Sequence, residues 1–271
     1  MFTNILVGVD GRPSGRDAIA LAGSLGDADV RLTLAYVHGS EVAEDVSDSD
    51  KLLEQERVAC GVEADVLSVV SASPGRGLHE QAEHQGADLL VVGSCSRGAF
   101  GRAMLGDDAR AALNGAPCAV AIAARGYAEQ HTQLKRIGVA YNGSPESALA
   151  LAGARELAAG TGAGVYALEV VSLPPAAYGG LVAPAIGDYA KELVEEASDR
   201  IAQLPDLDGR AVYGLAGEEL AAFGDQLDIL VVGSRGYGAV RRLVAGSTAD
   251  YLERHARCSL LVLPRSAAPR T

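Results

Sequence analysis

The residues best suited to chemistry lie near the C-terminus, where an apolar run ends in glycine, serine and arginine. Val231-Val232-Gly233-Ser234-Arg235-Gly236 is followed, after nine residues, by Gly246-Ser247-Thr248. Glycines let an oxyanion approach backbone N–H groups, and an arginine supplies a charged fork for it. Ser247 is predicted to open a helix with Asp250 completing a capping box, and a helix N-terminus suits phosphate. The residue types and their spacing therefore predict a phosphate-binding cradle.

A buried strand is expected to position this cradle. The run Leu227-Asp228-Ile229-Leu230-Val231-Val232 is short, apolar and rich in β-branched residues, which is typical of a strand that is covered on both faces. In open α/β sheets, ligands bind beyond the carboxyl ends of the strands. The cradle follows such an end, so the predicted strand would hold it at the binding edge of a sheet.

The chain contains an internal repeat. Ile5-Leu6-Val7-Gly8-Val9-Asp10-Gly11-Arg12-Pro13 aligns with the segment from Ile137 to Pro145 at an offset of 132, and Ala87–Ser94 aligns with Leu227–Ser234 at an offset of 140. The second copy has therefore gained eight residues, which we place around Leu173–Gly180. A repeat of this length indicates a duplicated domain. We predict domains at 1–126 and 135–271, joined by a linker at 127–134.

Strand-like and helix-like segments alternate within each copy. In the second copy strands are predicted near 136–141, 165–171, 210–215, 228–233 and 259–263, with helices near 145–159, 188–203, 217–225 and 248–256. This alternation favours an α/β fold, in which each copy is a Rossmann-like domain with a five-stranded parallel sheet and helices on both faces. The long loop between Pro174 and Ile186 is expected to form a lid or a partner surface.

Composition argues against several classes of partner. The chain has 35 acidic and 23 basic residues and a formal net charge of −12, which disfavours nucleic acid and membrane surfaces. We find no apolar run of about 20 residues and no basic secretion signal, so a cytoplasmic location is expected. The four cysteines form no C-x-x-C pair and no zinc-ligand spacing with the histidines, so no metal centre is predicted.

Taken together, the duplicated five-stranded unit, the polar residue after its first strand and the G-x-x-G-x₉-G-[ST] pattern resemble the universal stress protein family in its tandem form. The resemblance implies an adenine nucleotide alpha hydrolase-like fold with ATP as the ligand. Adenine would lie against the backbone near Val170, and the ribose would meet Ala140-Tyr141-Asn142. A magnesium ion could accompany ATP, although Asn142 brings no negative charge where ATP-binding members often carry Asp. The last strands, around Ala119–Ile122 and Leu260–Leu263, would pack the domains as a pseudo-dimer, and whole chains would form a homodimer.

The first copy departs from the phosphate pattern. It keeps Asp10, but Ser96 replaces the glycine at position 236, and Gly106-Asp107-Asp108 stands where the second copy has Gly246-Ser247-Thr248. Two carboxylates where phosphate should bind cost about 1 kcal/mol in water and several in a drier cleft. We predict that the first copy binds ATP weakly or not at all.

Three functional hypotheses remain open. The leading one is a nucleotide-dependent regulatory protein of the stress response, with ATP in the second domain, an unidentified protein partner and no catalytic residue, so that hydrolysis is slow at most. The second is a dimeric interaction scaffold of the same fold that binds no nucleotide. The third is an ATP-consuming transferase. The chain has no Gly-Lys pair for a P-loop, no complete G-x-G-x-x-G after a strand and no G-x-S-x-G.

Overall fold

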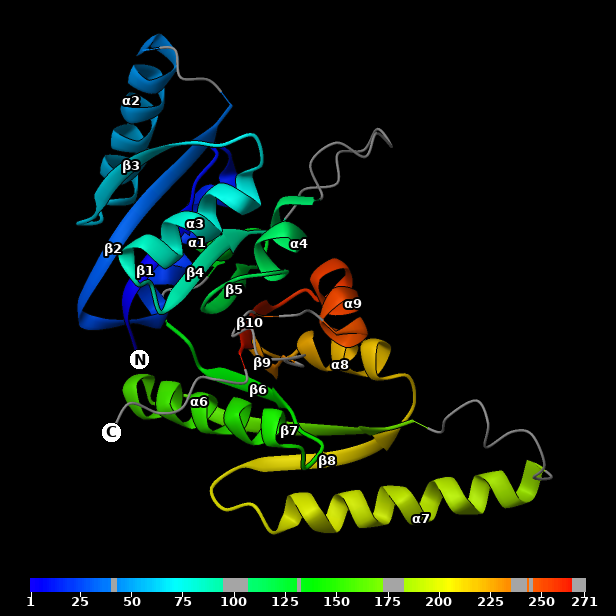
Figure 1. The fold of residues 1–271 in the computed structure, drawn as a ribbon. Helices are drawn as coiled ribbons and strands as arrows, with labels where there is room; N and C mark the ends of the chain where they lie inside the picture. Colours follow the sequence, from blue (N-terminus) through cyan, green and yellow to red (C-terminus); the bar gives the residue numbers. More distant parts are fainter. Residues whose placement is uncertain are drawn as a thin grey trace.

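The fold alternates strands and helices through two similar halves (Figure 1). The computed structural model describes residues 1–39, 43–94, 107–130, 133–172, 183–234, 243 and 246–264. The elements of the first half are β1 (Phe2–Gly8), α1 (Pro13–Leu25), β2 (Gly26–His38), α2 (Ala43–Cys60), β3 (Asp65–Val70), α3 (Pro74–Gln85), β4 (Leu89–Gly93), α4 (Asp107–Leu113) and β5 (Ala119–Ala123). After a short α5 (Tyr127–Gln130) come β6 (Arg136–Ala140), α6 (Pro145–Thr161), β7 (Gly164–Val171), α7 (Ala183–Ala202), β8 (Asp208–Tyr213), α8 (Ala216–Gly224), β9 (Ile229–Gly233), α9 (Ser247–His255) and β10 (Ser259–Leu263).

All ten of these strands form one sheet, in the order β3-β2-β1-β4-β5-β10-β9-β6-β7-β8. Within each half the pairs are parallel, and the strand order reverses between β1 and β4 and between β6 and β9. The chain is thus two tandem α/β domains, as the sequence predicted. Open parallel sheets bind ligands at such points of reversal, beyond the carboxyl ends of the strands.

The halves meet where β5 and β10 pair antiparallel (Figure 1). Val120, Ala121 and Ile122 stand opposite Val262, Leu261 and Leu260, and all six are at most 3% exposed. Pairing satisfies two strand edges that would otherwise be open and apolar. The predicted contact between the last strands is confirmed.

Helices cover both faces of the sheet, and each face has its own apolar core. One core packs α1, α2 and α6 against the sheet, and the other packs α3, α4, α8 and α9. Both cores contain residues from both halves, so the hydrophobic interior runs across the β5–β10 junction. Tyr127, at the start of the predicted linker, is 1% exposed within the first core. The N–H groups of Gly126 and Ala128 each donate to the buried carboxylate of Asp17 at 2.9 Å.

The predicted strands and helices of the second half are confirmed, with shifts of a few residues at their ends. The largest shift is in α7, which begins at Ala183 rather than near 188, so the predicted loop 174–186 was too long. Pro184 is compatible with this start because a helix tolerates proline in its first turn. Residues 173–182 lie outside the described residues.

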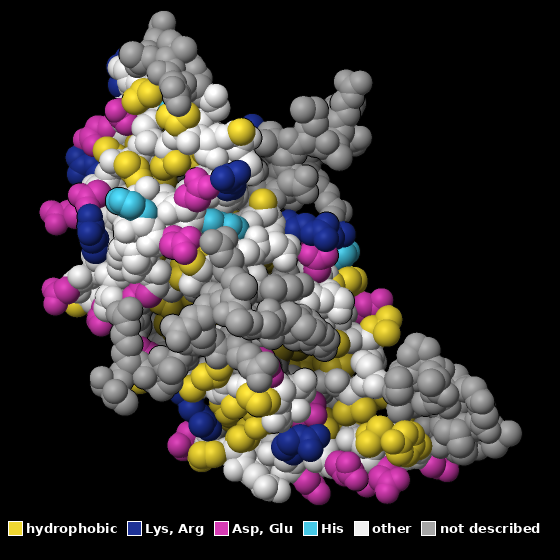
Figure 2. Space-filling model, in the orientation of Figure 1, with side chains coloured by type: hydrophobic (Ala, Val, Ile, Leu, Met, Phe, Trp, Pro, Cys, Tyr) yellow, Lys and Arg dark blue, Asp and Glu magenta, His cyan; other side chains and the backbone are white. Residues whose placement is uncertain are grey.

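Part of the acidic excess lies on the outer surface of α7. Figure 2 shows acidic side chains along the outer side of α7, where Asp188, Glu192, Glu195, Glu196 and Asp199 are all exposed. In the described parts of the chain, no helix combines the length and apolar character needed to cross a membrane.

Candidate functional site

A pocket of about 300 Å³ opens beyond the carboxyl ends of β6, β7 and β9. It lies at the point where the strand order of the second half reverses. Its lining residues are Ala140, Tyr141, Asn142, Ser144, Glu146, Ser147, Leu168, Val170, Ala216, Leu220, Val232, Gly233, Gly246, Ser247, Thr248 and Ala249. The volume is at the lower end of the range for small-molecule sites.

Side-chain hydrogen bonds fix the turn between β6 and α6. The Ser144 hydroxyl accepts from the Ser147 N–H at 3.2 Å and caps α6, while the Ser147 hydroxyl donates to the Ser144 carbonyl at 2.9 Å. Asn142 Oδ1 accepts from the Ser144 N–H at 3.1 Å. Gly143 between them has φ +73°, a conformation that favours glycine. The turn therefore has a defined shape where it lines the pocket.

This network occupies one acceptor position of the Asn142 side chain and leaves its amide nitrogen open to a ligand. Because Oδ1 accepts from the turn, the amide nitrogen is the group of this exposed side chain with no hydrogen bond among the described residues. An amide nitrogen donates and cannot hold a cation. The described residues bring together no group of three His, Cys, Asp or Glu side chains that could hold a metal ion.

Gly233 is required by packing at the end of β9. A Cβ added there would overlap the backbone carbonyl oxygen of Glu146, in the first turn of α6. Gly233 is not among the described glycines with positive φ, so close packing rather than an unusual backbone conformation requires glycine here. Its lack of a side chain lets the first turn of α6 approach the end of β9 beside the pocket that both line.

The N-terminus of α9 forms another part of the pocket wall. Gly246 is its N-cap, and no side-chain hydrogen bond caps the helix, so the predicted capping box is not formed. The reason is one of register: Ser247 is the first helical residue, and the Asp250 carboxylate instead pairs with Arg110 and Arg254. The first N–H groups of a helix have no partner within it. Those of Ser247, Thr248 and Ala249 thus give this wall donors and the positive end of the helix dipole.

The end of β7 presents Val170 to the pocket, next to an ion pair between buried Glu169 and exposed Arg200. Glu169 is 5% exposed and accepts from Arg200 of α7, from Nε at 3.2 Å and from Nη2 at 2.9 Å. This hydrogen bonding raises the pKa of Arg200. The pair ties α7 to β7 and so fixes the strand end on which Val170 lies.

Eight of the eleven residues predicted from the sequence line this one pocket: Ala140, Tyr141, Asn142, Val170, Gly233, Gly246, Ser247 and Thr248. Ser234 does not line it, being 2% exposed with a hydroxyl that has no hydrogen-bond partner in the described parts of the chain. Its N–H donates to the Leu263 carbonyl at 2.9 Å. Arg235 and Gly236 lie outside the described residues.

Comparison with known proteins identifies the fold family. The family model of the universal stress proteins matches residues 1–124 and again residues 133–264. The chain belongs to the universal stress protein family. A curated family member from Mycobacterium tuberculosis is 27% identical over 218 residues, which cover 77% of this chain and 75% of the relative.

Solved structures match this tandem arrangement over nearly its whole length. A universal stress protein from Archaeoglobus fulgidus superposes with a TM-score of 0.62 at 18% identity, covering 97% of this chain and 98% of that one. A protein of unknown function from Pseudomonas aeruginosa PAO1 gives a TM-score of 0.64, also at 18% identity, covering 97% and 93%. At these identities the likeness establishes the fold.

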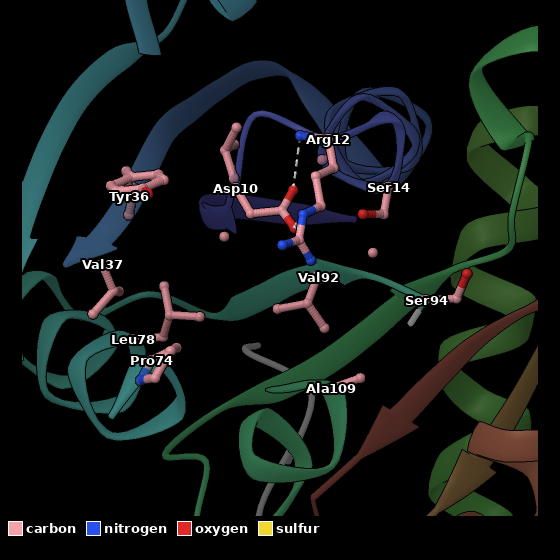
Figure 3. A pocket seen from close by; sticks show the side chains of 15 residues that line it. Asp10, Arg12, Ser14, Tyr36, Val37, Pro74, Leu78, Val92, Ser94 and Ala109 are labelled. Carbon is pink, nitrogen blue, oxygen red and sulfur yellow. Dashed lines mark hydrogen bonds and ion pairs between the residues drawn. The ribbon is translucent and has the colours of Figure 1, made fainter. Parts of the chain in front are cut away.

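The first half has an equivalent pocket of about 240 Å³, shown in Figure 3. There the Arg12 guanidinium extends between Asp10 and Val92, and its Nε lies 3.8 Å from an Asp10 oxygen. The Arg12 N–H also donates to Asp10 Oδ1 at 3.0 Å. A Cβ at Gly93 would overlap the Ser14 carbonyl oxygen, as at Gly233. Both pockets share one backbone plan, while the weak ATP binding of the first stays a prediction.

Sequence reasoning did not name several residues of the second pocket. Ser144, Glu146 and Ser147 lie two, four and five positions after Asn142, at the N-cap and in the first turn of α6, so the start of this helix was the signal that could have found them. Leu168 lies two positions before Val170 and therefore on the same face of the strand. Ala216 and Leu220 lie one helical turn apart on α8, and no local sequence signal assigns them to this pocket.

Proposed function

We propose that this chain binds an adenine nucleotide, in the first place ATP, in the pocket of its second domain. The observation that carries the proposal is the uncapped N-terminus of α9, which lines that pocket at the reversal point of the sheet. Unpaired N–H groups and the positive helix dipole favour phosphate. Apolar Leu168, Val170 and Leu220 line the same cavity and suit a base. Asn142 and the other residues of its turn would face the ribose.

The nucleotide would act as a regulator in the stress response rather than as a consumed substrate. Occupancy would alter the shape of the chain or its binding to an unidentified protein, with little or no hydrolysis. The proposal includes a homodimer of whole chains. Light scattering with and without ATP tests it, and a mass of one chain under both conditions counts against the dimer.

The first experiment denatures the purified protein, assays the supernatant for nucleotide, and titrates ATP and GTP by calorimetry with and without magnesium. We expect about one ATP per chain. In a Ser247→Asp/Thr248→Asp variant, which copies Asp107 and Asp108, we expect ATP to bind about a hundredfold more weakly, because carboxylates repel phosphate.

A matched control is Ser73→Asp, which places the same substitution at the N-cap of α3, away from this pocket. It should leave ATP affinity unchanged. The alternative is a scaffold of the same fold that binds no nucleotide. Neither co-purified nor titratable nucleotide in the folded wild-type protein would favour that alternative, and equal affinity in the double variant would place the nucleotide elsewhere.

A further inference from the structure

A reciprocal pair of backbone hydrogen bonds joins the first domain to the segment that precedes α9. The Leu243 N–H donates to the Ala116 carbonyl at 2.9 Å, and the Leu243 carbonyl accepts from the Gly115 N–H at 2.9 Å. Leu243 is 0% exposed and packs in the core shared by the two domains. Two opposed hydrogen bonds fix both the position and the orientation of this peptide, three residues before Gly246 in the pocket wall.

An ion pair across the same boundary reaches α9 itself. Arg110 Nη2 of α4 lies 3.1 Å from Asp250 Oδ2, and Arg254 Nη2 lies 3.0 Å from the same oxygen. Asp250 is in the first turn of α9, next to the residues that line the pocket. Its negative charge would repel phosphate, and the two arginines offset it. The adjacent placement of α4 and α9 is visible in Figure 1.

The first domain holds its side of this boundary firmly. The buried His79 ring of α3 contacts the Ala112 carbonyl of α4, with Nε2 at 2.8 Å. Gly75 lets α3 approach α4 so closely that an added Cβ would lie 2.5 Å from Ala111 Cβ. Gly115, which lies two residues after the end of α4, has φ +96°. A side chain there would meet only ordinary contacts, so the backbone conformation is what requires glycine.

We propose that the first domain positions the phosphate-binding end of the second. Arg110, Gly115 and Ala116 are positioning residues: they orient the N-terminus of α9 and neutralise Asp250 without themselves lining the pocket. The inference rests on the proposed nucleotide function. It predicts that damage to this boundary weakens binding of the phosphates and spares binding of the nucleoside.

The test titrates ATP and adenosine in parallel into full-length Gly115→Ala and Arg110→Ala variants. We expect ATP affinity to fall about fivefold to tenfold in each, and adenosine affinity to stay within about twofold of wild type. Arg110→Lys keeps the cation and should recover most of the loss. Equal loss for ATP and adenosine would indicate general damage and overturn the proposal.

Matched controls lie in the same domain. Gly86→Ala replaces another glycine of positive φ, at the end of α3, and Arg76→Ala breaks an exposed pair with Glu80. Both should leave the ratio of ATP to adenosine affinity unchanged, while thermal unfolding reports any loss of stability. An equal change in that ratio in these controls would contradict a specific role for the boundary.

A second readout needs no nucleotide. Hydrogen exchange of the amides from Leu243 to Leu252 should be at least tenfold faster in Gly115→Ala and Arg110→Ala than in wild type, and unchanged in the two controls. Wild-type exchange rates in both variants would overturn the positioning role. If the wild-type protein binds no ATP, the proposed function fails, and this measurement still decides whether the first domain orders α9.

Discussion

The two pockets of this chain share a backbone plan and differ in their polar side chains. Both lie where the strand order reverses, and both need a glycine where the first helix crosses the strand end. The first presents Asp10 with Arg12, whereas the second presents Asn142 with a capping Ser144. The frame is thus dictated by close packing, which duplication preserves, and the chemistry by surface side chains, which are free to diverge.

The largest expected effect comes from breaking the sheet that the two pockets share. Val262 is 0% exposed at the β5–β10 junction, so Val262→Lys would bury a charge and should destabilise the chain by about 4 kcal/mol or more. Val66→Lys on the outer strand β3, where valine is 36% exposed, should cost less than about 1 kcal/mol. Urea denaturation measures both, and similar costs would mean that the junction contributes little.

A smaller effect should follow from making the first pocket resemble the second. Asp107→Ser/Asp108→Thr removes two carboxylates from the start of α4, and we expect ATP binding at the first site to strengthen about tenfold. Calorimetry in the Ser247→Asp/Thr248→Asp background isolates that site. If affinity does not change, features other than charge exclude ATP there.

Exchanging the residues at the helix starts should change stability by about 1 kcal/mol in opposite directions. Arg12 is the N-cap of α1 and makes no side-chain cap hydrogen bond, whereas Ser144 caps α6. Arg12→Ser should therefore stabilise the protein and Ser144→Arg should destabilise it, each by about 1 kcal/mol. Thermal unfolding gives the sign of each change in stability. A loss of stability in both variants would show that Arg12 has a stabilising role of its own.

The smallest difference between the domains is expected in the reactivity of two thiols that occupy equivalent positions. Burial raises the pKa of Cys118 to about 12 and the pKa of Cys258 to about 12. In a Cys60→Ser/Cys95→Ser background, both should react with iodoacetamide at pH 8 about a thousandfold more slowly than a free thiol, and at similar rates. Much faster reaction of one would reveal local opening of its domain.

The same pKa values give a pH dependence of stability. Because each folded pKa lies above its unfolded value of about 9, the stabilising contribution is present below pH 9 and is lost as pH rises towards 12. Cys118→Ala/Cys258→Ala should flatten this alkaline decline in the free energy of unfolding. A decline of unchanged slope would assign it to other groups.

The sequence predicted what depends on short-range pattern, and missed what depends on register and long-range contact. Apolar runs such as that ending at Val232 were sufficient to predict the strands. The repetition of these runs was sufficient to predict the two domains. Ser234 was taken for a pocket residue, although it follows the last residue of β9, is buried and pairs through its N–H with Leu263 of β10. Leu243 opens the short apolar run Leu243-Val244-Ala245 in the spacer before Gly246, and a run of three residues gives no information about a contact with the other domain. Nothing local therefore indicated its pairing with Gly115 and Ala116.

The antiparallel pairing of β5 with β10 joins two halves of a single chain. Tethered partners meet at an effective concentration of the order of millimolar, whereas a dimer of separate domains must assemble from whatever concentration the cell provides. The paired halves should therefore survive dilution, and free single domains would compete poorly for either strand. Every molecule carries one pocket of each kind, so the ratio of the two sites is set by covalent connection and stays the same at any expression level.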